Sequence, residues 1–177
     1  MPYAFAHLIG AWLVGKIYQK ITKTKLGHYG WFFLLLGGIL PDIDFLLDWT
    51  IKTDLHRTLT HSLLFALIMA GLVFLFSSLF LRKKKEFANQ KLIFSIAIGL
   101  GILTHLALDS ISNFGVPLFW PLDYQFSVYH GSFIFEPAPE LAKSAATLAK
   151  EVKAAIIDMA LGTTWIFYLW FRRKLKF

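Results

Sequence analysis

The sequence has no cysteine among its 177 residues, and this absence limits both cross-linking and metal chemistry. Disulfide bonds and thiolate metal sites are excluded. A bound metal must therefore be held by histidine, aspartate, glutamate or water. The first residues, MPYAFAHLIGAW, also have neither a basic region nor a small-residue cleavage site. We therefore expect no cleaved signal peptide.

Charged residues are scarce as well. They make up 16% of the chain, whereas ordinary soluble domains carry roughly 25%. Hydrophobic residues make up 56%, and the mean hydropathy is +0.58. A soluble chain of this length has too little interior to bury so much apolar surface. We therefore predict an all-α, polytopic membrane helix bundle that forms a single domain over residues 1–177.

Long apolar runs supply the predicted spans, since a helix needs about 20 such residues to cross a bilayer. We predict about five transmembrane helices, at residues 3–18, 29–49 (interrupted by Pro41), 58–81, 92–111 and 154–171. The stretch ELAKSAATLAKEVKAA, residues 140–155, has strong helix formers but few large apolar residues. We expect it to form an interfacial or re-entrant helix instead.

The net charge of +7 matters through the position of the basic residues. If the helices alternate, 13 of the 18 lysines and arginines fall on one side of the membrane. The positive-inside bias makes that side cytoplasmic, with the N-terminus outside and the C-terminus in the cytoplasm. We therefore predict a multi-pass inner-membrane protein whose partner is the lipid bilayer, and we expect no nucleic-acid partner.

This topology brings histidines and aspartates from several helices to the outer leaflet. The charge count that fixes the topology does not use them. The candidate metal ligands are His7, Asp42, Asp44, His56, His61, His105 and Asp109. Ionisable side chains at membrane depth are costly and are functional candidates by default. His130 and Glu136, in the predicted outer loop, are candidates to complete the site.

HLALD places His105 and Asp109 four residues apart, which is one face of a helix. An imidazole and a carboxylate at this spacing can ligate one divalent metal. The alternative is a hydrogen bond that satisfies two buried polar groups.

PDID places Asp42 and Asp44 directly after an apolar run. Pro41 disfavours helix at Leu40, so a bent turn can direct both carboxylates inward. One can ligate a metal while the other bridges or holds a ligand histidine. The alternative is a helix end with two hydrated aspartates.

HRTLTHS contains His56 and His61, which diverge by about 140° on a continuous helix. If the helix starts near Thr58 or Thr60, Thr58 is its N-cap and His56 can turn back from the loop. The alternative leaves His56 in solvent. His7, a lone histidine in an apolar helix, has a core role as its alternative.

Together these residues form a set of imidazole and carboxylate ligands on one side of the membrane. Such a set suits Zn²⁺, or Mn²⁺ as the second choice. We expect one or two ions. A two-metal site can activate water and clamp both oxygens of a displacement at phosphorus.

The motifs GILPDID, HRTLTHS, HLALD and GVPLFWPL, over about residues 7–122, resemble the LexA-regulated, membrane-bound metal-dependent hydrolase family. That family is distantly similar to zinc-dependent phospholipase C and the single-strand zinc nucleases. The resemblance implies a helical phosphoester hydrolase with zinc held by His and Asp. One departure is that no further His-x-x-x-Glu or His-x-x-x-Asp pair follows His105 and Asp109.

We therefore expect a hydrolase at the outer membrane interface, acting on a phosphoester, with a lipid head group as one candidate substrate. A metal-activated water is the expected nucleophile, with Asp42 or Asp44 as the general base. Arg57 is the candidate contact for a phosphate oxygen, and an anchoring role is its alternative. Trp120, in the aromatic outer loop, is a candidate substrate contact.

Two other classes of protein remain open. A metal-ion or proton-coupled transporter can use the same His and Asp cluster, but it needs a polar path to the cytoplasmic side. The sequence offers little there beyond His28 and Ser95. A non-catalytic scaffold, in which metal only pins the helices together, is the third reading.

Overall fold

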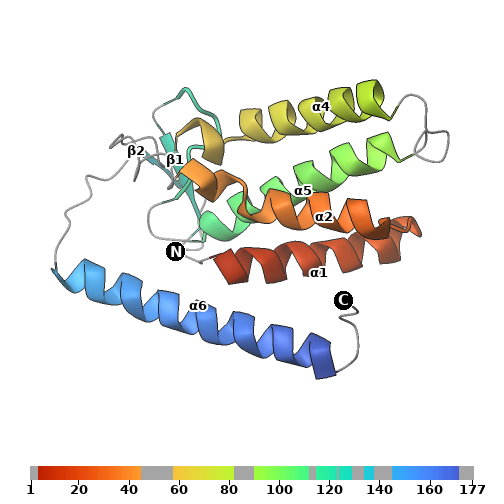
Figure 1. The fold of residues 1–177 in the computed structure, drawn as a ribbon. Coiled ribbons are helices and arrows are strands. Elements are labelled where there is room, and N and C mark those ends of the chain that lie inside the picture. The colour runs from red at the N-terminus through yellow and green to blue at the C-terminus, as the bar shows by residue number, and fades with distance from the viewer. Residues whose placement is uncertain are drawn as a thin grey trace.

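The computed structural model describes residues 4–44, 58–81, 90–111, 115–122, 124–128, 134–137 and 145–171. These residues are mostly helical, as predicted (Figure 1). The α-helices are α1 (Ala4–Thr22), α2 (Gly27–Ile39), α4 (Leu63–Phe80), α5 (Lys91–Asp109) and α6 (Ala145–Phe171). Two short 3₁₀ helices are η1 (Pro41–Ile43) and η2 (Leu59–His61). Each predicted span overlaps one of the α-helices.

The fold is not purely helical, which corrects the all-α prediction. Strands β1 (Tyr124–Ser127) and β2 (Ile134–Pro137) pair antiparallel, with Gln125 opposite Glu136. Val116 bridges to Phe126 on the other side of β1. The amide of Val128 donates to the carbonyl of Ser110, which ties the hairpin to the end of α5.

Two helices, α4 and α5, are long and apolar enough to cross a membrane. Helix α6 contains a shorter apolar stretch, Ile156–Ile166. Helix α2 has 13 residues, fewer than the roughly 17 needed for a span. Five transmembrane helices and their orientation therefore stay a prediction.

Helix α5 lies at the centre of the bundle and contacts α1, α2 and α4. Its crossing with α2 is very close, because Gly37 and Gly101 face each other there. A Cβ on either glycine would meet the backbone of the opposite helix. The residues buried around this crossing are apolar and include Leu34, Ile98 and Ile102.

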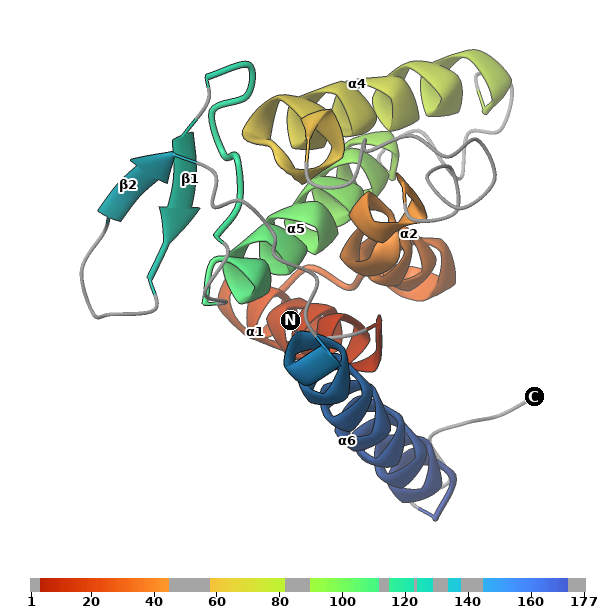
Figure 2. The same cartoon turned by 90° about the vertical axis from the view of Figure 1, so that its left-hand side faces the viewer.

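This packing brings four helix ends together. The carboxyl ends of α2 and α5 and the amino ends of α1 and α4 lie at the same end of the bundle, beside the β hairpin (Figure 1). Helix α6 lies next to α1 and is inclined away from the other helices (Figure 2). The predicted clustering of His and Asp at one end requires this arrangement of helix ends.

Two local predictions are wrong. Residues 145–155 do not form a separate interfacial or re-entrant helix, because α6 runs without a break from Ala145 to Phe171. Helix α4 is capped by Ser62 rather than Thr58: Ser62 is extended, and its hydroxyl accepts a hydrogen bond from the amide of Phe65 at 3.1 Å. The preceding residues, Leu59–His61, form the tighter turn η2 instead.

Candidate metal centre

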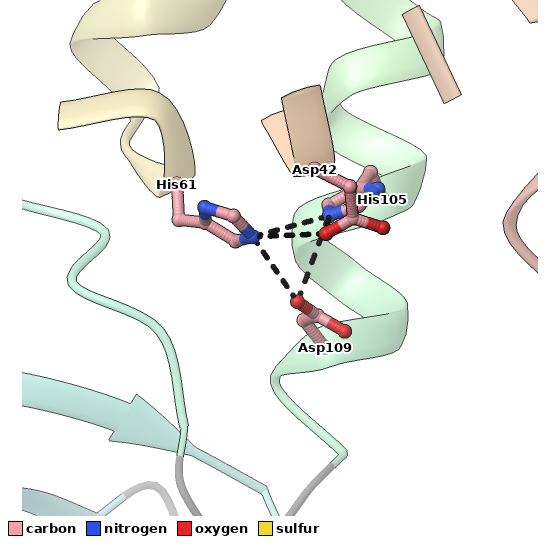
Figure 3. A group of neighbouring side chains, drawn as sticks. All are labelled: Asp42, His61, His105 and Asp109. Atoms are coloured by element: carbon pink, nitrogen blue, oxygen red, sulfur yellow. Dashed lines mark hydrogen bonds and ion pairs between the residues drawn. The ribbon is translucent and has the colours of Figure 1, made fainter. Parts of the chain in front are cut away.

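Four side chains from three separate elements converge at this end of the bundle. They are Asp42 from η1, His61 from η2, and His105 and Asp109 from α5 (Figure 3). Pro41 begins η1 directly after α2, and this turn directs Asp42 toward α5. His105 and Asp109 lie on the same face of α5, with Nε2 and Oδ2 separated by 3.6 Å.

The ligand atoms have the spacing expected around one metal ion. His61 Nε2 lies 3.3 Å from His105 Nε2, and each of these atoms lies 3.5 Å from Asp42 Oδ1. His61 Nε2 is 3.5 Å from Asp109 Oδ2, and all four ligand atoms lie within 4.8 Å of one another. Zinc bonds of about 2.0–2.1 Å in tetrahedral geometry give ligand separations of roughly 3.3–3.4 Å. The two nitrogens and two oxygens therefore fit a single zinc-type ion.

The Nδ1 atoms of His61 and His105, which are not the candidate ligand atoms, have polar partners that fix the rings. His105 Nδ1 donates to the carbonyl oxygen of Gly38 at 2.9 Å. Asp44 Oδ2 lies 3.4 Å from His61 Nδ1. The Thr60 hydroxyl donates to the same carboxylate at 2.5 Å and lies 3.1 Å from His61 Nδ1. Partners of this kind orient metal-binding imidazoles and raise their basicity.

These contacts determine which ring nitrogens carry protons. A carbonyl oxygen can only accept, so Nδ1 of His105 is protonated, and Asp44 favours the same tautomer in His61. Neutral rings then face each other with two Nε2 lone pairs at 3.3 Å. Such a pair is stable only with a cation between the lone pairs, either a proton or a metal ion. The chemistry of the donors therefore fits a metal.

The four candidate ligands differ in how far they are buried. The side chains of His61, His105 and Asp109 are at most 4% exposed, whereas that of Asp42 is 29% exposed. Asp42 therefore marks the side on which solvent reaches the cluster.

His61 and Asp42 lie outside α4 and α5, the two helices long and apolar enough to cross a membrane, and their pKa values reflect the shared charges. Burial alone lowers the pKa of His61, but contacts with Asp109, Asp42 and Asp44 outweigh it and raise the pKa to about 10. Burial alone raises the pKa of Asp42, but His61 and the neighbouring imidazoles hold it below its usual value. The carboxylates thus favour a positive charge at the centre of the cluster.

His7 extends the cluster on the α1 side. Its ring stacks on that of His105 with centroids 3.8 Å apart, and its side chain is 1% exposed. His7 Nε2 lies 3.4 Å from Asp109 Oδ1, the oxygen that does not face His61. Asp109 thus presents one oxygen to the group of four and the other to His7.

The remaining predicted site residues are placed as follows. Asp44 lies behind His61 rather than in the group of four, and it is 1% exposed. Trp120 is 38% exposed in the segment after α5. Glu136 lies in β2. His56, Arg57 and His130 lie outside the described residues.

Sequence reasoning missed two groups that support the ligands: the Thr60 hydroxyl and the Gly38 carbonyl. For Thr60, its position directly before His61 was an available signal. No sequence signal marks a backbone carbonyl. A third missed residue, Asp158, is buried in α6 at 5% exposure. Its signal was a lone carboxylate within an apolar helix.

Comparison with known proteins places the chain in a membrane family. No curated protein and no solved structure matches it. A family model described as the YdjM inner membrane protein matches residues 1–175. The match confirms the resemblance to a membrane-protein family, whereas the hydrolase activity and the likeness to phospholipase C and zinc nucleases stay predictions. With nearly the whole length matched, the chain belongs to the YdjM inner membrane protein family.

Proposed function

We propose that this protein is a membrane-bound, metal-dependent hydrolase of phosphoester bonds, with its site at the outer membrane interface. The observation that carries the proposal is the convergence of Asp42, His61, His105 and Asp109 at metal-ligand spacing. Two imidazoles and two carboxylates suit zinc, with manganese as the second choice. When bound, such an ion supplies Lewis acidity that activates water near neutral pH and polarises a phosphoryl oxygen.

Asp42 and Asp44 have different proposed roles in the reaction. Asp42 is the ligand that solvent reaches, so its free oxygen is the candidate to take a proton from an incoming water. Asp44 is buried against Nδ1 of His61, a position from which it orients the imidazole. We therefore assign the general base to Asp42 and a positioning role to Asp44.

A second ion would use the other oxygen of Asp109 together with Nε2 of His7. The 3.4 Å separation of these atoms matches one tetrahedral edge. A carboxylate shared by two ions is a common feature of sites that act on phosphoesters. His7→Ala should then lower the metal content by one ion per chain and leave the other ion bound.

Exposed aromatic side chains in the segment after α5 support a lipid-like substrate. Phe119 and Trp120 are 51% and 38% exposed. Their segment is tied to α4 by a hydrogen bond from the amide of Leu63 to the carbonyl of Leu118 at 3.0 Å. Aromatic rings of this kind favour the membrane–water interface, where a lipid head group is accessible. Trp120 is the candidate contact, and Arg57 keeps its predicted role toward phosphate.

The apolar core argues against a transporter. Among the described residues, the buried positions of α5 on the far side of His105 are mostly apolar, with Ile98 and Ile102 at the centre. The hydroxyls of Ser95 and Thr104 are bonded to the carbonyls of Ala70 and Leu100. An ion leaving the cluster toward the other membrane face meets no polar path there.

The test is hydrolysis by purified protein that has been stripped of metal and reloaded with zinc. Chromogenic phosphomonoesters and phosphodiesters, and phospholipid in mixed micelles, are the substrates. We expect zinc-dependent turnover that falls at least about 100-fold in His105→Ala, because a ligand is lost. His28→Ala is the matched control, since His28 is exposed at the start of α2. Bound metal without turnover on any substrate, or zinc flux in proteoliposomes, would contradict the proposal.

A further inference from the structure

Helix α6 carries a carboxylate that bonds to the first turn of α1. Asp158 Oδ2 accepts a hydrogen bond from the amide of Phe5 at 3.0 Å, and Oδ1 accepts one from the amide of Ala6 at 2.7 Å. The first amides of a helix have no partner within the helix. A negative charge there is also favoured by the helix dipole. Asp158 therefore acts as an N-cap supplied by another helix.

The surroundings of Asp158 show that this contact is specific. Asp158 is 5% exposed, whereas its neighbours Ile157 and Met159 are 61% and 62% exposed. One turn later the ring of Phe5 lies against Gly162, where a Cβ would collide with it. Two turns later Trp165 meets Trp12 edge to face, with centroids 5.8 Å apart. One stripe of α6 is thus fitted to α1, with the carboxylate at the amino end of α1.

His7 directly follows Phe5 and Ala6, the two residues whose amides Asp158 binds. Its ring is held differently from those of the other two histidines. Nδ1 of His61 and of His105 each has a fixed partner. Among the described residues, neither ring nitrogen of His7 makes a hydrogen bond, although both are buried, and Nε2 has only the 3.4 Å contact with Asp109 Oδ1. Its orientation therefore depends on the stacking against His105, on the contact with Asp109 and on the placement of the helix that carries it.

We propose that Asp158 is a positioning residue of the metal centre, which fixes the first turn of α1 so that His7 faces Asp109 and His105. This inference rests on the proposed function, because it assumes that His7 contributes to a metal site. It adds a residue from α6, an element that provides none of the candidate ligands. Loss of the carboxylate frees two amides and leaves the His7 ring without a fixed backbone.

The experiment compares metal binding by the full-length wild type, Asp158→Ala, Asp158→Asn, His7→Ala and the double variant His7→Ala/Asp158→Ala. Thr163→Ala is the control on the same helix, because Thr163 is exposed and its hydroxyl bonds to the carbonyl of Met159 in the preceding turn. Zinc affinity is measured by competition with a chelating dye. Ligand geometry is followed through the visible spectrum of the cobalt-substituted protein.

We expect Asp158→Ala to weaken zinc binding about 10-fold, the lower end of the range for groups that support ligands. Its cobalt spectrum should approach that of His7→Ala. Asp158→Asn, whose amide oxygen still accepts a bond, should restore part of the affinity. In the double variant the effect should not exceed that of His7→Ala alone, since Asp158 acts through His7.

Unchanged binding in Asp158→Ala, or effects that multiply in the double variant, would overturn the inference while leaving the metal centre intact. Absence of metal binding in the wild type would instead reject the proposed function, on which the inference rests. If Asp158→Ala does not fold, Asp158→Asn decides. Wild-type affinity and an unchanged cobalt spectrum in that variant would count against the inference.

Discussion

His61 and His105 point their Nε2 atoms at each other across 3.3 Å, and this contact is the most informative one at the scale of residues. Their Nδ1 atoms are fixed by groups that favour the neutral, metal-binding tautomer. The carboxylates around His61 nevertheless raise its pKa to about 10. In the absence of metal the cluster therefore holds a proton where the ion would bind.

Metal binding should therefore release a proton from His61. At pH 7 the raised pKa keeps the metal-free imidazole protonated, and coordination requires its lone pair. We expect about one proton released per chain for the ion held by the group of four. Calorimetric titration with zinc in two buffers of different ionisation enthalpy measures this number. His28→Ala should behave as wild type, and binding without proton release would show that His61 is neutral or does not bind.

Sequence reasoning at this scale predicted that His and Asp side chains from several helices converge, but not how they divide their roles. His105 and Asp109 are tied by helical periodicity, so their shared face was predictable from spacing alone. Asp42 and Asp44 were not separable, because their directions depend on the tight turn after Pro41. That turn places Asp42 with the ligands and Asp44 behind His61. Thr60 was missed because its role depends on the position of Asp44 in the fold.

At the scale of elements, the two short 3₁₀ helices η1 and η2 direct Asp42 and His61 toward α5, which continuous α-helix would not do. Continuous helix through residues 41–44 or 59–63 would rotate Asp42 and His61 by different angles relative to α5. Ser62 begins α4 after η2 and leaves His61 on the inner side. Such turns follow from tertiary contacts, so the sequence alone predicted a helix start near Thr58. The sequence likewise predicts two separate helices where the structure has α6 alone. The amino-terminal part of α6 lacks large apolar residues, yet it continues the same helix.

Helices α2 and α5 cross so closely that a side chain at Gly37 should not be tolerated. Gly37→Ala would place a methyl group against the carbonyl of Ile98 and the backbone of Gly101. We expect a loss of about 1–3 kcal/mol in the free energy of unfolding, as for overpacked cores.

Denaturation of detergent-solubilised protein measures this loss. Gly71→Ala is the control, because a Cβ at Gly71 in α4 meets nothing within 4 Å. Equal stability of the two variants would mean that the helices are not this close.

At the scale of the whole molecule, polar chemistry is concentrated at one end. Helices α1, α2, α4 and α5 each bring one end to this place, over a largely apolar core. Composition predicted the membrane class, and membership of an inner-membrane family agrees with it. The number of spans and their orientation depend on how the bilayer sits on α1, α2 and α6, which the helix lengths alone do not decide.

The central claim is that the four converging side chains form a metal centre. The most direct test is to titrate chelator-treated, purified protein with zinc and measure bound metal by mass spectrometry. We predict at least one tightly bound ion per chain, lost in His61→Ala and His105→Ala and retained in His28→Ala. No bound zinc or manganese in the wild type, or full binding in the two ligand variants, would contradict the account.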